Sequence, residues 1–243
     1  MTETKAAPGR RADMVRNRRL LIEAASAAFA EHGVEASMGE IAQRAGVAKG
    51  TVFRHFPSKE DLLAAIVLQM LDRLIRMADG LREADDAAAA LREFMTDGVE
   101  VIAADRAFCE VVGRPSLQHA EVRDTIDRLC AAAEALTARA REQGVVRDDI
   151  TGTDIVLLLG GIHRTAAPLL AAQPQAWRRY LELALDGLRA ADAQPLPHRP
   201  PHRLHLTDQP GLTDQPGLTD HPGLTDHPGL TETPGLTDAP GLG

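Results

Sequence analysis

Apolar residues recur at intervals of three and four along much of the chain, which is the period of an amphipathic helix. The pattern is clear in three stretches that lie far apart: Leu21, Ala25, Ala28 and Phe29; then Leu62, Ile66, Met70, Leu74 and Met77; and later Leu181, Leu185 and Leu188. Strand-like alternation is nearly absent, only 3% of the residues are aromatic, and the dominant residues are good helix formers. The sequence therefore predicts an all-α fold.

Glycine, proline and capping residues divide this pattern into about nine helices. We expect them at about 13–32, 37–45, 48–56, 58–81, 86–104, 107–112, 119–143, 151–167 and 175–191. Gly33, Gly46 and Gly144 mark stops between them. Ser37 with Glu40, and Ser58 with Asp61, have the spacing of capping boxes at helix starts.

The composition changes after residue 191. Residues 206–241 hold six copies of a six-residue unit, LTDxPG, with glutamate in place of the aspartate in the fifth copy. A six-residue period occurs in β-helices, but each unit holds a proline, which lacks the N–H group that a strand ladder needs. We therefore expect residues 193–243 to form a disordered, low-complexity tail or a loose string of turns.

Charge is distributed unevenly. The chain carries a net charge of −8, yet residues 1–60 hold ten Lys/Arg against seven Asp/Glu, so their net charge is +3 and the remainder carries −11. This asymmetry allows a polyanion to bind the N-terminal part and disfavours binding elsewhere.

Several classes of protein are disfavoured by what the chain lacks. It has no nucleophile elbow, phosphate loop or zinc-protease motif, and Cys109 and Cys130 match neither a metal spacing nor a disulfide framework. No apolar run reaches the ~18 residues of a membrane helix, and the N-terminus lacks an apolar signal core. We expect a cytoplasmic protein that is no enzyme and needs no cofactor, metal or membrane.

The two short helices joined at Gly46 have the size of a helix-turn-helix, whose second helix enters the major groove of DNA. We expect one set of residues to make the buried contacts between the two helices: Ile41, Ala42, Ala45, Val47 and Val52. We expect a second set to point outward: Lys49, Thr51, Arg54 and His55. Arg54 suits a guanine edge and Thr51 a thymine methyl or a phosphate. Lys59, in the first turn of the next helix, suits a phosphate. The alternative is an ordinary helix pair with a basic, solvated face.

The stretch LLIEAASAAFAEHGVEASMGEIAQRAGVAKGTVFRHFPSKEDLLAAI, from Leu20 to Ile66, resembles the N-terminal domain of TetR-family transcriptional regulators. The likeness rests on the alanine-rich first helix, the IAxxAGVxxGTxxxHF core and the lysine that opens the fourth helix. It implies that three N-terminal helices bind operator DNA, while a larger helical domain binds a small ligand and forms a homodimer. A second stretch, VVRDDITGTDIVLLLGGI, resembles the C-terminal domain of the SbtR-like subgroup.

Carried over position by position, the resemblance implies an operator-facing set of Lys49, Gly50, Thr51, Phe53, Arg54 and His55, with Lys59 on a phosphate. Phe53 departs from the family pattern, because many members have a tyrosine there whose hydroxyl group binds a phosphate. The basic residues Arg10, Arg11, Arg16, Arg18 and Arg19 suit either an additional DNA contact or a solubilising arm, and both interpretations stay open.

The expected organisation has four parts: a flexible basic arm at 1–12, a helix-turn-helix DNA-binding domain at 13–60, a ligand-binding and dimerisation domain at 61–192, and the tail at 193–243. Candidate ligand contacts are Met70, Leu74, Met77, Phe94, Phe108, Leu117, Leu129 and His163. Candidate dimer contacts are Ile155, Leu158, Leu159, Ile162, Leu181, Leu185 and Leu188, because the helix at 151–167 is apolar nearly all round.

The leading hypothesis is a homodimeric repressor that binds a palindromic operator and is released by an unknown small molecule. The alternatives are an activator, a helical ligand-binding protein with altered operator binding, and an enzyme.

Overall fold

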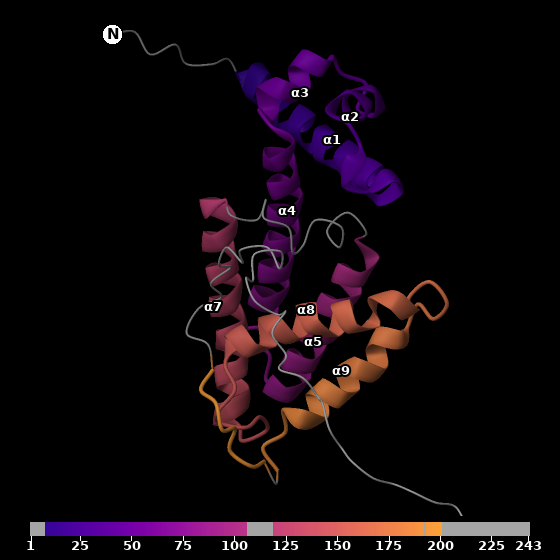
Figure 1. Cartoon of the computed structure of the whole chain (residues 1–243). Helices are drawn as coiled ribbons and strands as arrows, with labels where there is room; N and C mark the ends of the chain where they lie inside the picture. The colour runs from indigo at the N-terminus through magenta and orange to yellow at the C-terminus, as the bar shows by residue number, and fades with distance from the viewer. Residues whose placement is uncertain (1–7, 106–118, 192, 201–243) are drawn as a thin grey trace, which may run out of the picture. The chain divides into compact units, whose positions relative to one another are not determined.

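The computed structural model describes residues 8–105, 119–191 and 193–200 (Figure 1). The chain divides into two units, Met1–Leu206 and Thr207–Gly243, and every described residue belongs to the first. Within these ranges the secondary structure is helical, apart from one isolated antiparallel bridge between Val146 and Arg189. The predicted all-α fold is confirmed. The expected helix at 107–112 and the LTDxPG repeats lie outside the described residues.

The α-helices are α1 (Pro8–His32), α2 (Met38–Arg44), α3 (Lys49–His55), α4 (Lys59–Gly80), α5 (Ala87–Ala104), α7 (Ala120–Glu142), α8 (Gly152–Ala166) and α9 (Ala176–Gly187). Short 3-10 turns follow α1 at Gly33–Glu35 and α8 at Ala167–Leu169. The first helix begins at Pro8 rather than Asp13, since proline suits the first helical position, where no N–H partner is required. Helix α1 therefore includes part of the segment that the sequence assigned to a flexible arm.

Helices α1, α2 and α3, which we call the head, pack on one another through buried apolar side chains. Phe29 of α1, Ile41 of α2 and Val52 of α3 are each fully buried, and Phe56 closes the end of α3 at 1% exposure. The turn between α2 and α3 places Gly46 at a φ of 69°, a left-handed conformation that favours glycine. The inward-facing side of the predicted helix-turn-helix is thus confirmed.

One of the two predicted capping boxes is complete. At the start of α4, the Asp61 N–H donates to Ser58 Oγ at 3.1 Å, and the Ser58 N–H donates to Asp61 Oδ2 at 2.9 Å. The side-chain bond from the Ser58 hydroxyl is the main reason that the pKa of Asp61 is lowered.

The other predicted box, at the start of α2, is only half formed. The Glu40 N–H donates to Ser37 Oγ at 3.2 Å, but Glu40 Oε1 lies 2.7 Å from Nδ1 of His32 instead of returning to the Ser37 N–H. The prediction of a full box was wrong because His32, at the end of α1, binds this carboxylate.

The remaining helices continue the same cluster of buried apolar residues. Helix α4 packs against α7, α7 against the start of α8, which crosses it, and α8 against both α5 and α9 (Figure 1). The connection between α4 and α5 is held by Arg139 of α7 and by Gln143, the residue that follows α7. Arg139 donates to the carbonyls of Arg82 and Ala84, and Gln143 donates to the carbonyl of Asp85 at 3.0 Å. These bonds fix the entry to α5.

Helix α8 begins at Gly152, which lies directly against the backbone of α7. A Cβ atom at this position would clash with the backbone nitrogen of Glu134. The Gly152 N–H donates to Glu134 Oε2 at 2.5 Å, and Arg141 binds the other oxygen of this carboxylate at 2.6 Å. Only a residue without a side chain fits there.

The first residues of the predicted tail are attached to the α7–α8 connection. The Leu196 N–H donates to Asp149 Oδ2 at 2.8 Å, and Arg147 donates to the carbonyl of Gln194. Arg147 also binds Asp149 through two bonds of 2.6 and 3.0 Å. These bonds lower the pKa of Asp149 to about 2, with the Arg147 bond as the largest cause. Residues 194 and 196 are thus bonded to the α7–α8 connection, while the LTDxPG repeats lie outside the described residues.

Candidate nucleic-acid interface

Helix α3 presents a continuous outer face. Lys49, Gly50, Phe53 and Arg54 are exposed, whereas Val52 is buried in the head. Thr51 and His55 are half-buried at the sides of this face. The structure thus brings six of the seven predicted DNA-facing residues together on one helix of seven residues.

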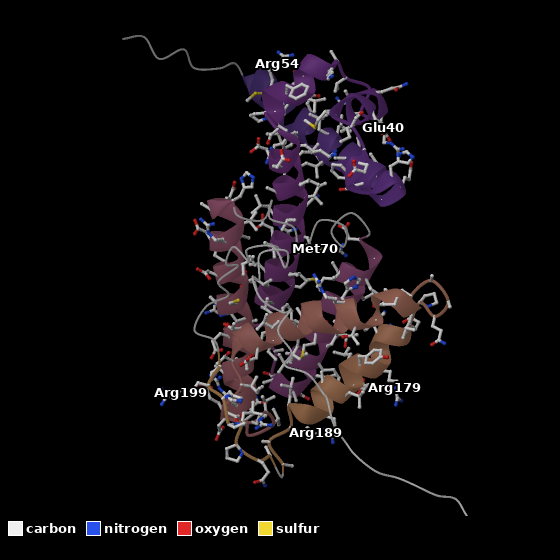
Figure 2. All side chains as sticks on the ribbon, in the orientation of Figure 1. Glu40, Arg54, Met70, Arg179, Arg189 and Arg199 are labelled. Atoms are coloured by element: carbon white, nitrogen blue, oxygen red, sulfur yellow. The ribbon has the colours of Figure 1, made fainter. Side chains whose placement is uncertain are left out.

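Arg54 is held against its own helix (labelled in Figure 2). Its Nη2 donates to Thr51 Oγ1 at 3.0 Å, and its Nε donates to the Gly50 carbonyl at 3.4 Å. Both bonds lie on the exposed surface, so water or a DNA base can replace them at low cost. An arginine placed in this way can exchange its intrahelical partner for the two acceptors of a guanine edge.

Phe53 is an exposed aromatic side chain on the same face. Its relative exposure is 42%, and Nζ of Lys49 lies 5.9 Å from the centroid of its ring. This distance is at the outer limit of a cation–π interaction. The ring and the charge are therefore presented side by side.

Lys59, the seventh predicted residue, lies in the first turn of α4, with Nζ 5.9 Å from the ring centroid of Phe29. Its position beside the N–H groups that open α4 suits a phosphate oxygen. Lys59 and the outer face of α3 belong to consecutive helices, separated only by Phe56, Pro57 and Ser58.

Sequence reasoning did not assign a position to Arg18, which it grouped with the basic arm. The guanidinium of Arg18 lies 4.7 Å from the ring centroid of Phe56, directly after the end of α3. Arg19, its neighbour, instead pairs with Glu23 along α1 at 3.4 Å. The sequence pattern could not distinguish the roles of Arg18 and Arg19, because the contact of Arg18 with Phe56 depends on how α1 packs against the end of α3.

One ion pair and one histidine–carboxylate hydrogen bond join α1 to α2 at the edge of the head. Arg44 binds Glu31 through both guanidinium nitrogens, with the longer bond at 2.8 Å, and His32 binds Glu40 (labelled in Figure 2). The bond from Arg44 is the main cause of the lowered pKa of Glu31. These contacts orient α2, and thereby the turn that positions α3.

The predicted ligand contacts occupy different environments. Met70, Leu74, Phe94 and Leu129 are buried in the apolar cluster, Met77 and His163 are half-buried, and Phe108 and Leu117 lie outside the described residues. Burial lowers the pKa of His163, and the charge of Arg164 lowers it further, so its neutral form is favoured at neutral pH.

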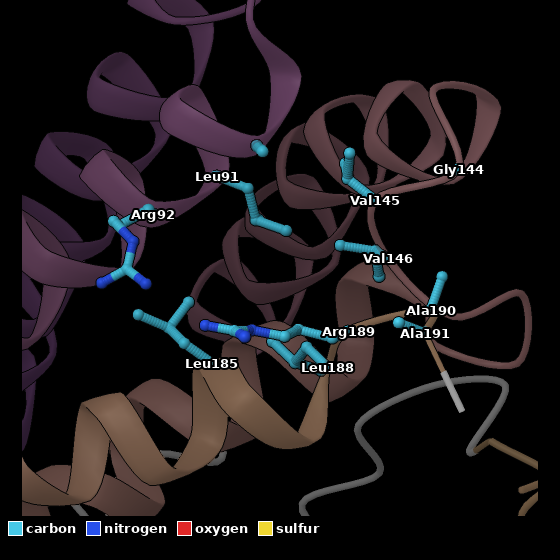
Figure 3. Close-up of a pocket in the computed structure, with 11 residues that line it drawn as sticks. Leu91, Arg92, Gly144, Val145, Val146, Leu185, Leu188, Arg189, Ala190 and Ala191 are labelled. Atoms are coloured by element: carbon cyan, nitrogen blue, oxygen red, sulfur yellow. The ribbon is translucent and has the colours of Figure 1, made fainter. Parts of the chain in front are cut away.

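None of the six candidates among the described residues lines the cleft of about 340 Å³ that lies between α5, the α7–α8 connection and the end of α9. Its floor is apolar, and Figure 3 shows Arg189 extending across it toward Leu185. Arg92, at its edge, is bound to Glu182 at 2.7 Å. Within the described residues, the predicted contacts and this cleft are separate features.

Most of the predicted dimer contacts are buried within this chain. Exposure is at most 5% for Ile155, Leu159, Ile162, Leu181 and Leu188, while Leu158 and Leu185 are half-buried. A side chain covered by its own subunit has little surface left for a partner. The exposed apolar residues of α8 and α9 are instead Leu157 at 46% and Leu183 at 60%, with Gly160 and Gly161 also open on α8.

Two family profiles match the chain. Residues 21–66 match "Bacterial regulatory proteins, tetR family", and residues 86–190 match "Transcriptional regulator SbtR-like, C-terminal domain". The solved TetR regulator SCO0520 of Streptomyces coelicolor is 32% identical, with 71% of this chain and 98% of that chain covered at a TM-score of 0.52. The regulator PfmR of Thermus thermophilus is 31% identical over 70% of this chain and 96% of its own, at a TM-score of 0.55. The fold and the exposed face of α3, the second helix of the helix-turn-helix, thus define a helix-turn-helix transcription regulator. The chain belongs to the TetR family.

Curated relatives match over shorter stretches. The transcriptional activator FasR of Mycolicibacterium smegmatis is 37% identical over 81 residues, which cover 33% of this chain and 36% of FasR. The probable acrEF/envCD operon repressor of Escherichia coli is 36% identical over 98 residues, which cover 38% of this chain and 44% of the repressor. These matches therefore span less than half of each protein. No helix of the described residues is long and apolar enough to cross a membrane.

Proposed function

We propose that this protein is a homodimeric repressor that binds a palindromic operator through α3 and is released by a small molecule. The observation that carries the proposal is the outer face of α3, where Lys49 and Arg54 flank an open glycine on an otherwise acidic protein. A basic, narrow second helix is what a helix-turn-helix inserts into the major groove.

The residues have separate roles in this proposal. Arg54 reads a base, Lys49 and Lys59 bind phosphates, and Thr51 and His55 contact DNA at the sides of α3. Residues 13–60 then form the DNA-binding domain and residues 61–192 the ligand-binding and dimerisation domain.

The proposed dimer uses the exposed faces of α8 and α9. Leu157 and Leu183 supply apolar surface, and Gly160 and Gly161 allow a partner helix to approach closely. Two copies related by a two-fold axis present two α3 helices, which require an operator with two-fold symmetry.

Release by ligand is a shift between two states of the dimer. The effector must bind more tightly to a dimer whose α3 helices are spaced wrongly for the operator, because equal affinity for both states shifts nothing. The candidate contacts Met70, Leu74, Met77, Phe94, Leu129 and His163 are mostly apolar, which favours an effector with substantial apolar surface.

Selection of bound DNA from a random pool tests the proposal. We expect a palindromic sequence whose binding weakens steeply with salt. Arg54→Ala should relax sequence preference at one position of each half-site, whereas Lys59→Ala should weaken all duplexes about equally. Recovery of no preferred sequence by the wild-type protein would contradict the proposal.

A second candidate is an activator that uses the same DNA surface, since the similar protein FasR is named an activator. A reporter placed behind the selected operator separates the two. Deletion of the regulator should raise expression for a repressor and lower it for an activator.

A further inference from the structure

The outer face of α3 has an open position at Gly50 that the fold does not require. A Cβ atom built there meets no atom within 4 Å, and the φ of Gly50 is not in the left-handed region. Glycine is the least favourable helix residue after proline. The local structure therefore accepts alanine at residue 50, and the reason for glycine must lie in what approaches α3 from outside.

The ring of Phe53 borders this open position. Residues three apart lie on the same side of a helix, so Phe53 follows Gly50 on the outer face. The ring is 42% exposed, with the Lys49 ammonium 5.9 Å from its centroid. A surface phenylalanine has no group that can donate to a phosphate, so its contribution to a complex must be apolar.

We propose that the Phe53 ring and the open position at Gly50 bind the C5 methyl group of a thymine in each operator half-site. The inference rests on the proposed function, because it requires α3 to lie in the major groove. In that groove the thymine methyl is the distinctive apolar feature, and apolar side chains recognise it. The missing side chain of Gly50 lets the helix backbone approach the base edge, and Lys49, beside the ring, meets the neighbouring phosphate.

The competing role for Phe53 is van der Waals contact with the sugar-phosphate backbone, which carries no sequence information. The two roles differ in one measurable property. Base reading depends on the methyl group of one thymine, whereas backbone contact does not.

The test uses the selected operator with each thymine replaced in turn by deoxyuridine, which removes only the methyl group. Dissociation constants are measured by fluorescence anisotropy at a fixed salt concentration. For the wild-type protein we expect one thymine in each half-site at which the replacement weakens binding about fourfold, the ratio that corresponds to ~0.8 kcal/mol for one buried CH₂ group.

Variants assign the effect to Phe53. Phe53→Ala should bind the thymine and deoxyuridine operators equally, and Phe53→Tyr, which keeps the ring, should retain the difference. Gly50→Ala fills the open position, so the difference should shrink while the melting temperature is not lowered. Circular dichroism establishes that each variant is folded, and the deoxyuridine scan of the wild-type protein needs no variant.

Three results would overturn the inference: equal binding of every deoxyuridine operator by the wild-type protein, a selected half-site without thymine, or a methyl dependence that persists in Phe53→Ala. Each of these leaves the proposed function intact, since the protein still binds a specific duplex. Failure to select any preferred duplex would instead remove the proposed function itself.

Discussion

Three phenylalanines of the head each lie close to a cation. Phe29 faces Lys59, Phe53 faces Lys49 and Phe56 faces Arg18. Phe29 and Phe56 are buried side chains, so their rings are fixed by the core. A fixed ring limits where its cation can lie, with an energy of about 0.5–1 kcal/mol for an exposed pair. In this way buried rings of the head help to place two of its positive charges, those of Arg18 and Lys59.

Arg18 is expected to bind a DNA phosphate, because Phe56 holds its guanidinium beside the end of α3. Arg18→Ala should reduce the slope of log affinity against log salt by about 0.9 for each phosphate that the arginine neutralises, hence by about 1.8 for a dimer. The slope is measured by titrating the selected operator at several salt concentrations.

Arg19→Ala is the matched control, since Arg19 is adjacent in sequence but pairs with Glu23. Its slope should stay close to that of the wild-type protein. Equal slopes for the two variants would mean that net charge alone, and not the stack on Phe56, determines the salt dependence.

At the scale of helices, the packing of α7 against α8 depends on one missing side chain. Gly152→Ala would place a methyl group against the backbone of Glu134 and Cys130, which cannot rotate away. The two helices must separate, and we expect the free energy of unfolding to fall by about 1–3 kcal/mol. Chemical denaturation measures this change.

Gly80→Ala, at the end of α4, is the comparison variant. Nothing lies within 4 Å of a Cβ atom at residue 80, so the stability should be unchanged or slightly higher. If both variants lost the same stability, the close approach of α7 and α8 would not be the cause.

The attachment of the segment after α9 should depend on pH. The pKa of Asp149 is lowered from 3.8 to about 2, so its bonds to Arg147 and Leu196 contribute stability above pH 3.8 and lose it as the pH falls toward 2. Urea unfolding at a series of pH values should show a stability difference between wild type and Asp149→Asn that is constant near neutral pH and vanishes at about pH 2.

Asp148→Asn changes the same charge one residue earlier, at an exposed position, and should show no such pH-dependent difference. An equal effect of the two substitutions would point to general electrostatics rather than to the bonds of Asp149.

The sequence predicted the helices and the turn of the head because the signals for these features are local. The left-handed backbone conformation at residue 46 favours glycine, and the capping box of Ser58 and Asp61 needs only residues within one helical turn. Contacts between elements were not accessible in the same way. Glu40 has the spacing of a capping residue, yet His32 of α1 takes its carboxylate. An apolar helix such as α8 does not indicate which of its sides is covered within the chain, so Ile155 and Leu157 could not be distinguished from the pattern alone.

At the scale of the whole molecule, dimer formation determines whether one α3 helix or two can bind the same operator. Leu183→Asp would place a charge on the exposed face of α9, where the side chain is 60% exposed and the folded chain can tolerate it. We expect sedimentation to give a mass near 26.1 kDa instead of twice that value, together with weaker operator binding.

Leu196→Asp is the control for this prediction, since Leu196 is 48% exposed but lies outside α8 and α9. It should leave the assembly unchanged. A dimeric Leu183→Asp variant would place the interface on another face of the chain.

The bonds of Arg54 to Thr51 and Gly50 have a consequence for how the protein tolerates imperfect operators. An arginine without an alternative partner would be left unsatisfied at a wrong base, at a cost of about 1–3 kcal/mol. At a wrong base, Arg54 can instead keep its bonds to Thr51 and Gly50. The mismatch then loses the binding energy of the base contact, but it does not leave the guanidinium without a hydrogen-bond partner. In the proposed complex, this arrangement makes the discrimination by Arg54 at that base pair modest.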